Sequence, residues 1–189
     1  YNDVIFSPIN KAIKPHDTEN ILDHYFLNSR GAIARFDRNA IEIRLVDIQE
    51  CPQADIAICI LIIEVVKLLV SNQTSSLEAQ KNWTKEALYS ILNPCIKDAE
   101  NHIIYKLDYL NLYQIEQACT VKDVWKQLYN LVKPNIHNSH HVAIETILEH
   151  GTLSTRILKA IDNDFSDENI KNVYSKLGQC LQENKFFIP

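Results

Sequence analysis

The chain has 189 residues, of which 46% are hydrophobic and 23% are charged, and its formal net charge is −5. These values are ordinary for a soluble globular protein large enough to form one domain with a substantial core. The negative charge and the absence of short basic clusters argue against a nucleic-acid partner.

The five cysteines are scattered and never form a C-x-x-C pair. This usage indicates reduced thiols in a cytoplasmic protein rather than a disulfide framework or a zinc site. They are Cys51, Cys59, Cys95, Cys119 and Cys180.

The first segment, residues 1–17, contains two prolines and is predicted to be irregular. A helix is predicted over residues 18–30, with Thr18 or Asp17 as its N-cap and Gly31 placed to end it. Its apolar stripe would consist of Ile21, Leu22, Tyr25 and Phe26.

A β-hairpin is predicted next, from the segments 32–36 and 40–47, because the turn formers Asp37 and Asn39 separate them. Side chains alternate across a strand, so one face of the second strand carries Ile41, Ile43 and Leu45. We expect this apolar face to be buried against the helix that follows. Glu42 and Arg44 would share the opposite face, and Arg35 would join them if the register allows.

The most apolar run is residues 56–70, which Glu64 and Lys67 interrupt. A membrane-spanning helix needs about 20 apolar residues, so we predict a core helix from about Asp55 to Val70, entered after Pro52. No membrane association is expected.

The rest of the chain is predicted to be mainly helical. Helices are expected over residues 77–92 (ending at Asn93-Pro94), 120–133, 139–150 and 167–182, whereas residues 101–116 are ambiguous and include a candidate short strand. The fold class is therefore α+β, mostly helical with a small antiparallel strand pair. We treat residues 1–189 as a single region, with a lead-in (1–17), a helix and hairpin (18–50) and a helical part (54–189).

The charged face of the hairpin has two interpretations. It is either a solvated sheet face with a surface ion pair, worth about 0–1 kcal/mol, or a site for metal-bound phosphates. Glu42 offers a hard oxygen ligand for Mg²⁺, and Arg44 offers a forked permanent cation for phosphate oxygens.

Residues 30–58 resemble the glutamate–cysteine ligase family, in particular its carboxylate–amine ligase branch. The family has a strand of the form E-[IV]-R followed by an Asp and a long apolar helix, matched here by Glu42, Arg44 and Asp47. Arg35 matches an Arg before the turn. Weaker resemblances lie at Asn82-Trp83 and in residues 150–158, where Gly151, Thr152, Arg156 and Leu158 match a G-T-x-A-x-R-Q-L element.

The resemblance implies ATP-dependent ligation of a glutamate-like carboxylate to a cysteine-like amine through an acyl phosphate, with ATP and Mg²⁺ as cofactors. By matching position, Glu42 would bind Mg²⁺, and Arg44 and Arg35 would be the catalytic and cofactor-binding cations. Arg44 would contact the ATP phosphates, and Arg35 would lie near the phosphates or the substrate carboxylate. Arg156 would assist in binding the cofactor. Asp47 would orient its neighbours.

The family's other metal-binding carboxylates lie on strands N-terminal to this region. The resemblance therefore implies the C-terminal part of a glutamine-synthetase-like ligase fold, which needs an N-terminal half and allows a homodimer. The alternative is a non-catalytic helical binding or interaction module of the same ancestry. A third hypothesis is a helical interaction domain in which the charged strand face has no function.

Other clusters are better explained by structure than by chemistry. His137 and His141 have a zinc-compatible spacing, and His140 lies between them, but no third ligand is evident. The acidic residues Asp162, Asp164, Asp167 and Glu168 lack the Gly and terminal Glu of a calcium loop and suit the start of the last helix. No candidate base that would activate Cys51 as a nucleophile is evident near it in the sequence.

Overall fold

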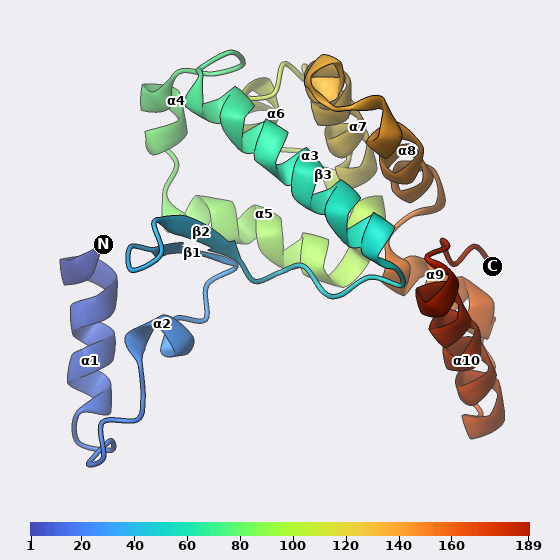
Figure 1. The fold of residues 1–189 in the computed structure, drawn as a ribbon. Coiled ribbons are helices and arrows are strands. Elements are labelled where there is room, and N and C mark those ends of the chain that lie inside the picture. The colour runs from blue at the N-terminus through green and yellow to red at the C-terminus, as the bar shows by residue number, and fades with distance from the viewer. The chain divides into compact units, whose positions relative to one another are not determined.

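The computed structural model describes all 189 residues. The chain forms two compact units, Tyr1–Ile48 and Gln49–Pro189, which are shown with their elements labelled in Figure 1. The division falls between the hairpin region and the helical part, which the sequence analysis treats as parts of a single region.

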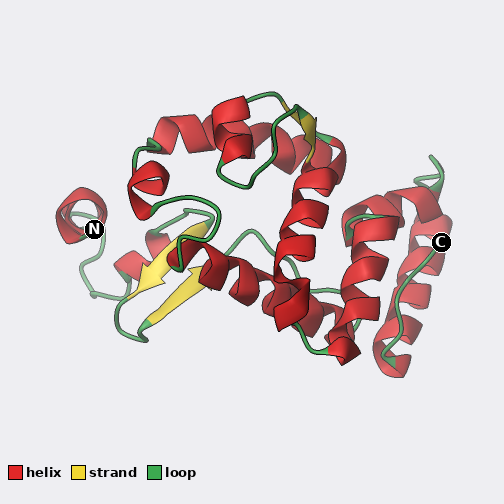
Figure 2. Ribbon diagram, turned by 90° about the horizontal axis from the view of Figure 1, so that it is seen from above, coloured by secondary structure: helices red, strands yellow, loops and turns green.

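Helices dominate the second unit, and the strands of the chain are confined to two antiparallel pairs (Figure 2). The first unit contains η1 (Asn2–Phe6), α1 (Ser7–Ile13), α2 (His24–Leu27), β1 (Ala32–Arg35) and β2 (Ala40–Ile43). The second contains α3 (Pro52–Val70), α4 (Leu77–Lys81), α5 (Lys85–Asp98), η2 (Ala99–Asn101), β3 (Ile103–Ile104), α6 (Leu107–Asn111), β4 (Cys119–Thr120), α7 (Val121–Val132), η3 (Lys133–Asn135), η4 (Asn138–His140), α8 (His141–His150), α9 (Leu153–Ile161) and α10 (Asp167–Glu183). The predicted α+β class, mostly helical with a small antiparallel pair, is confirmed.

The N-terminal segment is helical, so the prediction of an irregular lead-in is wrong. A π-helical turn, η1, runs directly into α1. Pro8 lies in the first turn of α1, directly after η1, so the helical segment continues past it without the hydrogen bond that a proline cannot donate. Pro15 lies two residues beyond the last residue of α1, where proline commonly follows a helix. Neither proline therefore prevents a helix in this segment.

The predicted helix over residues 18–30 is also wrong, because only α2 forms there. Asn20 has a left-handed φ of 52°, which interrupts a right-handed helix. The carboxylate of Asp17 accepts hydrogen bonds from the backbone N–H of Ile21 and Leu22, each at 2.9 Å, and so stabilises a loop. Asp23 provides the N-cap of α2 and accepts from Tyr25 N at 2.7 Å.

The predicted hairpin is confirmed, with residues 36–39 forming its turn. Ile33 pairs with Glu42 and Arg35 with Ala40, and directly opposed residues of an antiparallel pair share a face. Arg35, Glu42 and Arg44 therefore lie on one face of the hairpin, as predicted.

The burial of the two hairpin faces is the reverse of the prediction. Ile33 and Arg35 on the charged face are buried, whereas Ile41, Ile43 and Leu45 on the apolar face are exposed. The reason is that α2 of the same unit packs on the charged face: the Tyr25 ring lies over the Arg35 guanidinium, and Arg44 Nη2 donates to Tyr25 O.

The core of the second unit is built around α3, which confirms the predicted core helix. Beyond Ala54 in its first turn, its buried residues are Ala57, Leu61, Val65 and Leu68. Their spacing of three or four residues places them on one helix face. They belong to a single apolar cluster with buried residues of α7 and α8, so α3 buries a stripe rather than its whole circumference. No helix is long and apolar enough to cross a membrane.

The predicted helix over residues 77–92 is instead two helices. Thr84 caps α5 by accepting from Ala87 N at 3.2 Å, which separates α5 from α4. The predicted stop at Asn93-Pro94 is wrong, because α5 continues through Pro94 to Asp98. An interior proline removes a hydrogen bond from a helix and thereby weakens it without always ending it.

The C-terminal helices agree with their capping signals. Thr120 and Asp123 form the capping box of α7, Gly151 follows α8, and Ser166 caps α10. The short strand expected within residues 101–116 is β3, which pairs with β4. A further helix, α9, occupies part of the segment that matches the G-T-x-A-x-R-Q-L element.

The capping box of α7 makes a direct test of this local reasoning. Thr120→Ala removes the hydroxyl that accepts from Asp123 N at 3.1 Å, so the free energy of unfolding should fall by about 1 kcal/mol. Thr120→Ser keeps the hydroxyl and should lose less than half of that. Urea unfolding followed by tryptophan fluorescence measures both, and equal losses in the two variants would contradict the assignment.

Candidate functional site

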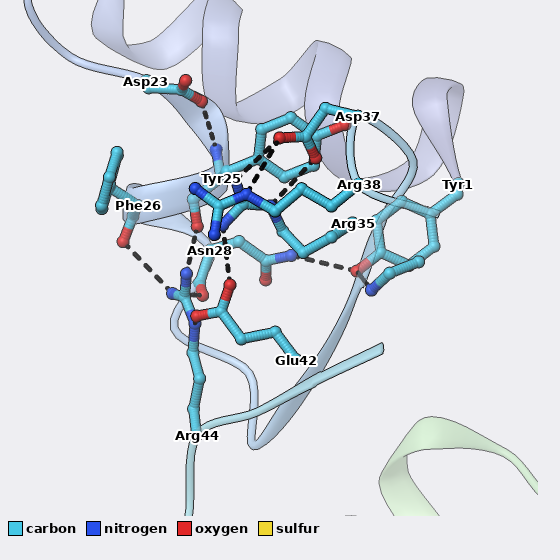
Figure 3. Close-up of polar contacts among 11 residues, drawn as sticks. Tyr1, Asp23, Tyr25, Phe26, Asn28, Arg35, Asp37, Arg38, Glu42 and Arg44 are labelled. Atoms are coloured by element: carbon cyan, nitrogen blue, oxygen red, sulfur yellow. Dashed lines mark hydrogen bonds and ion pairs between the residues drawn. The ribbon is translucent and has the colours of Figure 1, made fainter. Parts of the chain in front are cut away.

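Glu42 lies at the centre of the charged face of the hairpin, between two arginines (Figure 3). Its Oε2 accepts a hydrogen bond from Arg35 Nη1 at 2.7 Å, and its Oε1 accepts one from Arg44 Nε at 2.8 Å. The two guanidinium groups come from adjacent strands, or their immediate continuation, and converge on one carboxylate.

Arg44 is held in place by backbone carbonyls around α2. Its Nη2 donates to Tyr25 O at 2.7 Å, and its Nη1 donates to Asn28 O at 2.7 Å and Phe26 O at 3.4 Å. These carbonyls are at the C-terminal end of a helix, where a cation is favourable. The Arg44 side chain therefore joins β2 to α2 and has little freedom to turn away.

Arg35 is held by Asp37 and by an aromatic ring. Its Nε and Nη2 donate to the two carboxylate oxygens of Asp37 at 3.0 and 2.8 Å. Its guanidinium carbon lies 4.5 Å from the centroid of the Tyr25 ring. The Arg35 side chain is only 7% exposed, compared with 41% for Asp37, 35% for Glu42 and 22% for Arg44, so Arg35 is the buried member of the cluster and the other three are partly accessible.

The four charges of the cluster balance, with Arg35 and Arg44 against Asp37 and Glu42. Hydrogen bonds from Arg35 and then Arg44 lower the pKa of Glu42, and the hydrogen bond from Arg35 lowers the pKa of Asp37. In return, hydrogen bonds to Asp37 and then to Glu42 raise the pKa of Arg35. Arg35, Asp37 and Glu42 therefore stabilise one another in their ionised forms.

Metal binding at this face would depend on Glu42. The structure contains no group of three or more His, Cys, Asp or Glu side chains arranged to hold a metal ion. Both oxygens of Glu42 already accept from guanidinium groups, so a bound Mg²⁺ would replace at least one of these contacts. A site of this kind would take one carboxylate from this chain, and its remaining ligands would come from phosphates, water or other residues.

Asp47 follows the hairpin, and its Oδ1 accepts a hydrogen bond from the backbone N–H of Ile48 at 2.8 Å. This contact lies in the backbone beyond β2, and the orienting role of Asp47 stays a prediction.

Arg156 lies in the second unit, in a fully buried ion pair with Glu50. Its Nη1 also donates to Phe187 O at 2.8 Å and its Nε to Gly151 O at 3.2 Å. Glu50 in turn accepts from Phe187 N at 3.2 Å. Contact between Arg156 and a cofactor would therefore leave the buried Glu50 carboxylate without its partner. In this structure, Arg156 instead connects distant segments of its own unit.

The histidine and acidic clusters take part in local hydrogen bonds. His137 Nδ1 contacts Ser139 Oγ, and His141 Nδ1 contacts the Tyr129 hydroxyl, each at 2.8 Å. Asp164 Oδ1 accepts from Ser166 N at 3.0 Å at the start of α10. These contacts agree with the structural explanations of both clusters.

Three residues of the site were missed by sequence reasoning: Tyr25, Asn28 and Asp37. The available signal was for Asp37, because an Asp in the turn directly after a strand that ends in Arg is close enough to form an ion pair with it. Tyr25 was assigned to an apolar stripe, and Asn28, fully buried beside Arg30 and the Tyr1 hydroxyl, had no sequence signal.

Comparison with known proteins adds one distant relative. The chain is 25% identical over 173 residues to a protein of Archaeoglobus fulgidus that is described only as uncharacterized. The match covers 89% of this chain but 39% of the relative, so the chain spans about two fifths of the relative's length. No protein-family model and no solved structure matches the chain.

The lowered carboxyl pKa values predict acid sensitivity of the hairpin. A carboxyl whose pKa is lower in the folded state stabilises that state above its unfolded pKa, ordinarily 4.5 for Glu42 and 3.8 for Asp37. This contribution disappears as the pH falls through the folded values. Hydrogen exchange of the Arg44 amide, which donates to Gly31 O at 2.7 Å, should lose protection below pH 4.5 after correction for intrinsic rates. In Glu42→Gln, protection should be lower at pH 6 and less dependent on pH; an unchanged pH dependence would contradict the pairing.

The buried ion pair predicts a large effect of Arg156. Arg156→Met leaves the Glu50 carboxylate buried without its counter-charge and should lower the free energy of unfolding by about 3–5 kcal/mol. The control Lys159→Met removes an exposed cation from the same helix and should change it by less than about 0.5 kcal/mol. The double variant Glu50→Leu/Arg156→Met should recover part of the loss, because no unpaired charge remains. A loss below about 1 kcal/mol in Arg156→Met would contradict the assignment.

Proposed function

We propose that this chain supplies part of the ATP and Mg²⁺ site of a carboxylate–amine ligase of the glutamate–cysteine ligase type, with a glutamine-synthetase-like fold completed by other residues. The observation that carries the proposal is the convergence of Arg35 and Arg44 on Glu42. The residues that match the family's E-x-R element are thus neighbours in space as well as in sequence.

The geometry of the two arginines suits phosphate oxygens. A guanidinium group has five N–H donors in a plane, and its fork matches a carboxylate or a phosphate equally well. Arg35 uses three of its donors, on Asp37 and Glu42. The Glu42 carboxylate therefore occupies a position in which the arginines bind an anion, and a phosphate would be bound by the same donors.

Mg²⁺ and nucleotide would enter this site together. Glu42 would hold the metal ion, which would supply positive charge at the phosphates, and the N–H donors of Arg35 and Arg44 that now bind Glu42 would bind the phosphates. Arg44 would remain oriented by its carbonyl partners and Arg35 by Asp37 and Tyr25. Orientation that exists before binding lowers the entropy lost when the ligand binds.

In the proposed reaction, a glutamate-like carboxylate attacks the γ-phosphorus of ATP, and ADP leaves. An amine then attacks the acyl phosphate and releases inorganic phosphate. Both reactants of the first step are anions, so the role of Arg35, Arg44 and the metal is to neutralise charge and align the groups. The remaining ligands and the substrate pocket would come from residues outside this chain, which matches only 39% of its relative.

A second candidate function is a non-catalytic binding module of the same ancestry. The observation that favours it is that the charges of the cluster are mutually satisfied, because both oxygens of Glu42 and the carboxylate of Asp37 are already paired. Such a network stabilises the hairpin without any ligand.

Binding and turnover of ATP by the complete gene product distinguish these functions. With saturating Mg²⁺, Glu42→Gln and Arg44→Ala should each lower kcat by about 100-fold or more, because each removes a group that stabilises developing charge. Release of phosphate in the presence of glutamate and amino-acid amines is the assay.

Arg38→Ala is the matched control. Arg38 is an exposed arginine of the same hairpin, 67% accessible, and its Nε is 3.6 Å from Asp37 Oδ2. Its loss should change kcat by less than about twofold. Equal activity in wild type, Glu42→Gln and Arg44→Ala would refute the ligase proposal, and ATP binding without turnover would favour the second candidate.

A further inference from the structure

We infer that Tyr25 is a positioning residue that orients both arginines of the site, Arg35 through its ring and Arg44 through its backbone carbonyl. The role in catalysis rests on the proposed function, whereas the orientation itself is a property of the hairpin unit. No resemblance or sequence motif assigns a role to this tyrosine.

The ring of Tyr25 lies against the Arg35 guanidinium, with 4.5 Å between the guanidinium carbon and the ring centroid. At this distance a cation is attracted to an aromatic face. The ring is itself fixed by Phe6, whose centroid lies 4.9 Å away in a T-shaped contact. Arg35 is thus held between an aromatic surface and the carboxylates of Asp37 and Glu42, which fixes the plane of its fork.

The backbone of Tyr25 holds the other arginine. Arg44 Nη2 donates to Tyr25 O at 2.7 Å, while Tyr25 N donates to Asp23 Oδ1 at 2.7 Å (Figure 3). Asp23 is the N-cap of α2, a helix of four residues. So short a helix is marginal alone, and its contacts with Arg44 and Arg35 therefore stabilise it while it orients them.

This arrangement explains why α2 forms at this place in the chain. Residues of α2 and its C-cap provide the carbonyl acceptors for Arg44. One of these carbonyls belongs to Tyr25, whose ring is also the aromatic ring found over the Arg35 guanidinium. A change in the Tyr25 side chain should therefore affect Arg35 strongly and Arg44 weakly. This asymmetry separates positioning from general loss of the fold.

The orientation is tested by NMR without ligand. In the wild-type protein, Tyr25 ring protons should show NOEs to Arg35 Hδ and Hε, and the ring current should move these Arg35 signals upfield. Tyr25→Phe should keep the shift, because the Tyr25 ring and carbonyl make the contacts, and Tyr25→Leu should lose it. The absence of these NOEs in wild type overturns the inference, whatever the variants do.

The functional part is tested by Mg²⁺-dependent ATP binding and turnover of the complete gene product. Tyr25→Leu should weaken ATP binding or lower kcat by about 3- to 30-fold, and Tyr25→Phe should stay within about twofold of wild type. Phe36→Leu is the control, since Phe36 is an exposed aromatic of the same hairpin whose ring contacts are with Tyr1 and Phe6.

The outcomes separate this inference from the proposed function. If Tyr25→Leu loses the Arg35 shift but keeps full activity while Arg44→Ala is inactive, the positioning role is overturned and the ligase proposal stands. If the wild type neither binds nor hydrolyses ATP, the proposed function and the catalytic role both fail, and the NMR result still decides the orientation. Loss of the shift and of activity together, restored in Tyr25→Phe, supports the inference.

Discussion

The carboxylate of Glu42 between the guanidinium groups of Arg35 and Arg44 is the interaction on which the first unit depends. It joins the two strands of the hairpin, and Arg44 extends the connection to α2. A two-stranded hairpin and a four-residue helix are each marginal in isolation. Polar contacts that would be weak on an open surface here link three short elements.

The second unit is organised in a different way, around apolar packing of α3, α7 and α8. A single buried ion pair nevertheless joins its extremities, because Glu50 precedes α3 and accepts from Phe187 near the C-terminus. Gly151 belongs to the same group, since its carbonyl accepts from Arg156 and its φ of 92° suits a glycine. Both units thus use paired arginine and glutamate, but only the pair in the hairpin is accessible to a ligand.

This difference bears on two of the three arginines that the resemblance selected. Arg44 and Arg156 have the same side chain, but Arg44 lies in a partly exposed cluster and Arg156 in a buried ion pair. Removing Arg156 would destabilise the fold. A matching position in a motif therefore does not by itself imply contact with a cofactor. The environment of the guanidinium group, namely its exposure and its existing partners, decides which role it is able to take.

The sequence by itself determined the elements with strong local signals: the hairpin with its turn, the core helix α3, and the capped helices α7 and α10. Caps and periodicity act within a few residues, so they are readable from the chain alone. Only the tertiary structure decided that the charged face of the hairpin is the covered one, that Tyr25 and Asn28 belong to the site, and that Arg156 meets a glutamate 106 residues away. Such contacts depend on which distant segments pack together, and no local pattern records that choice.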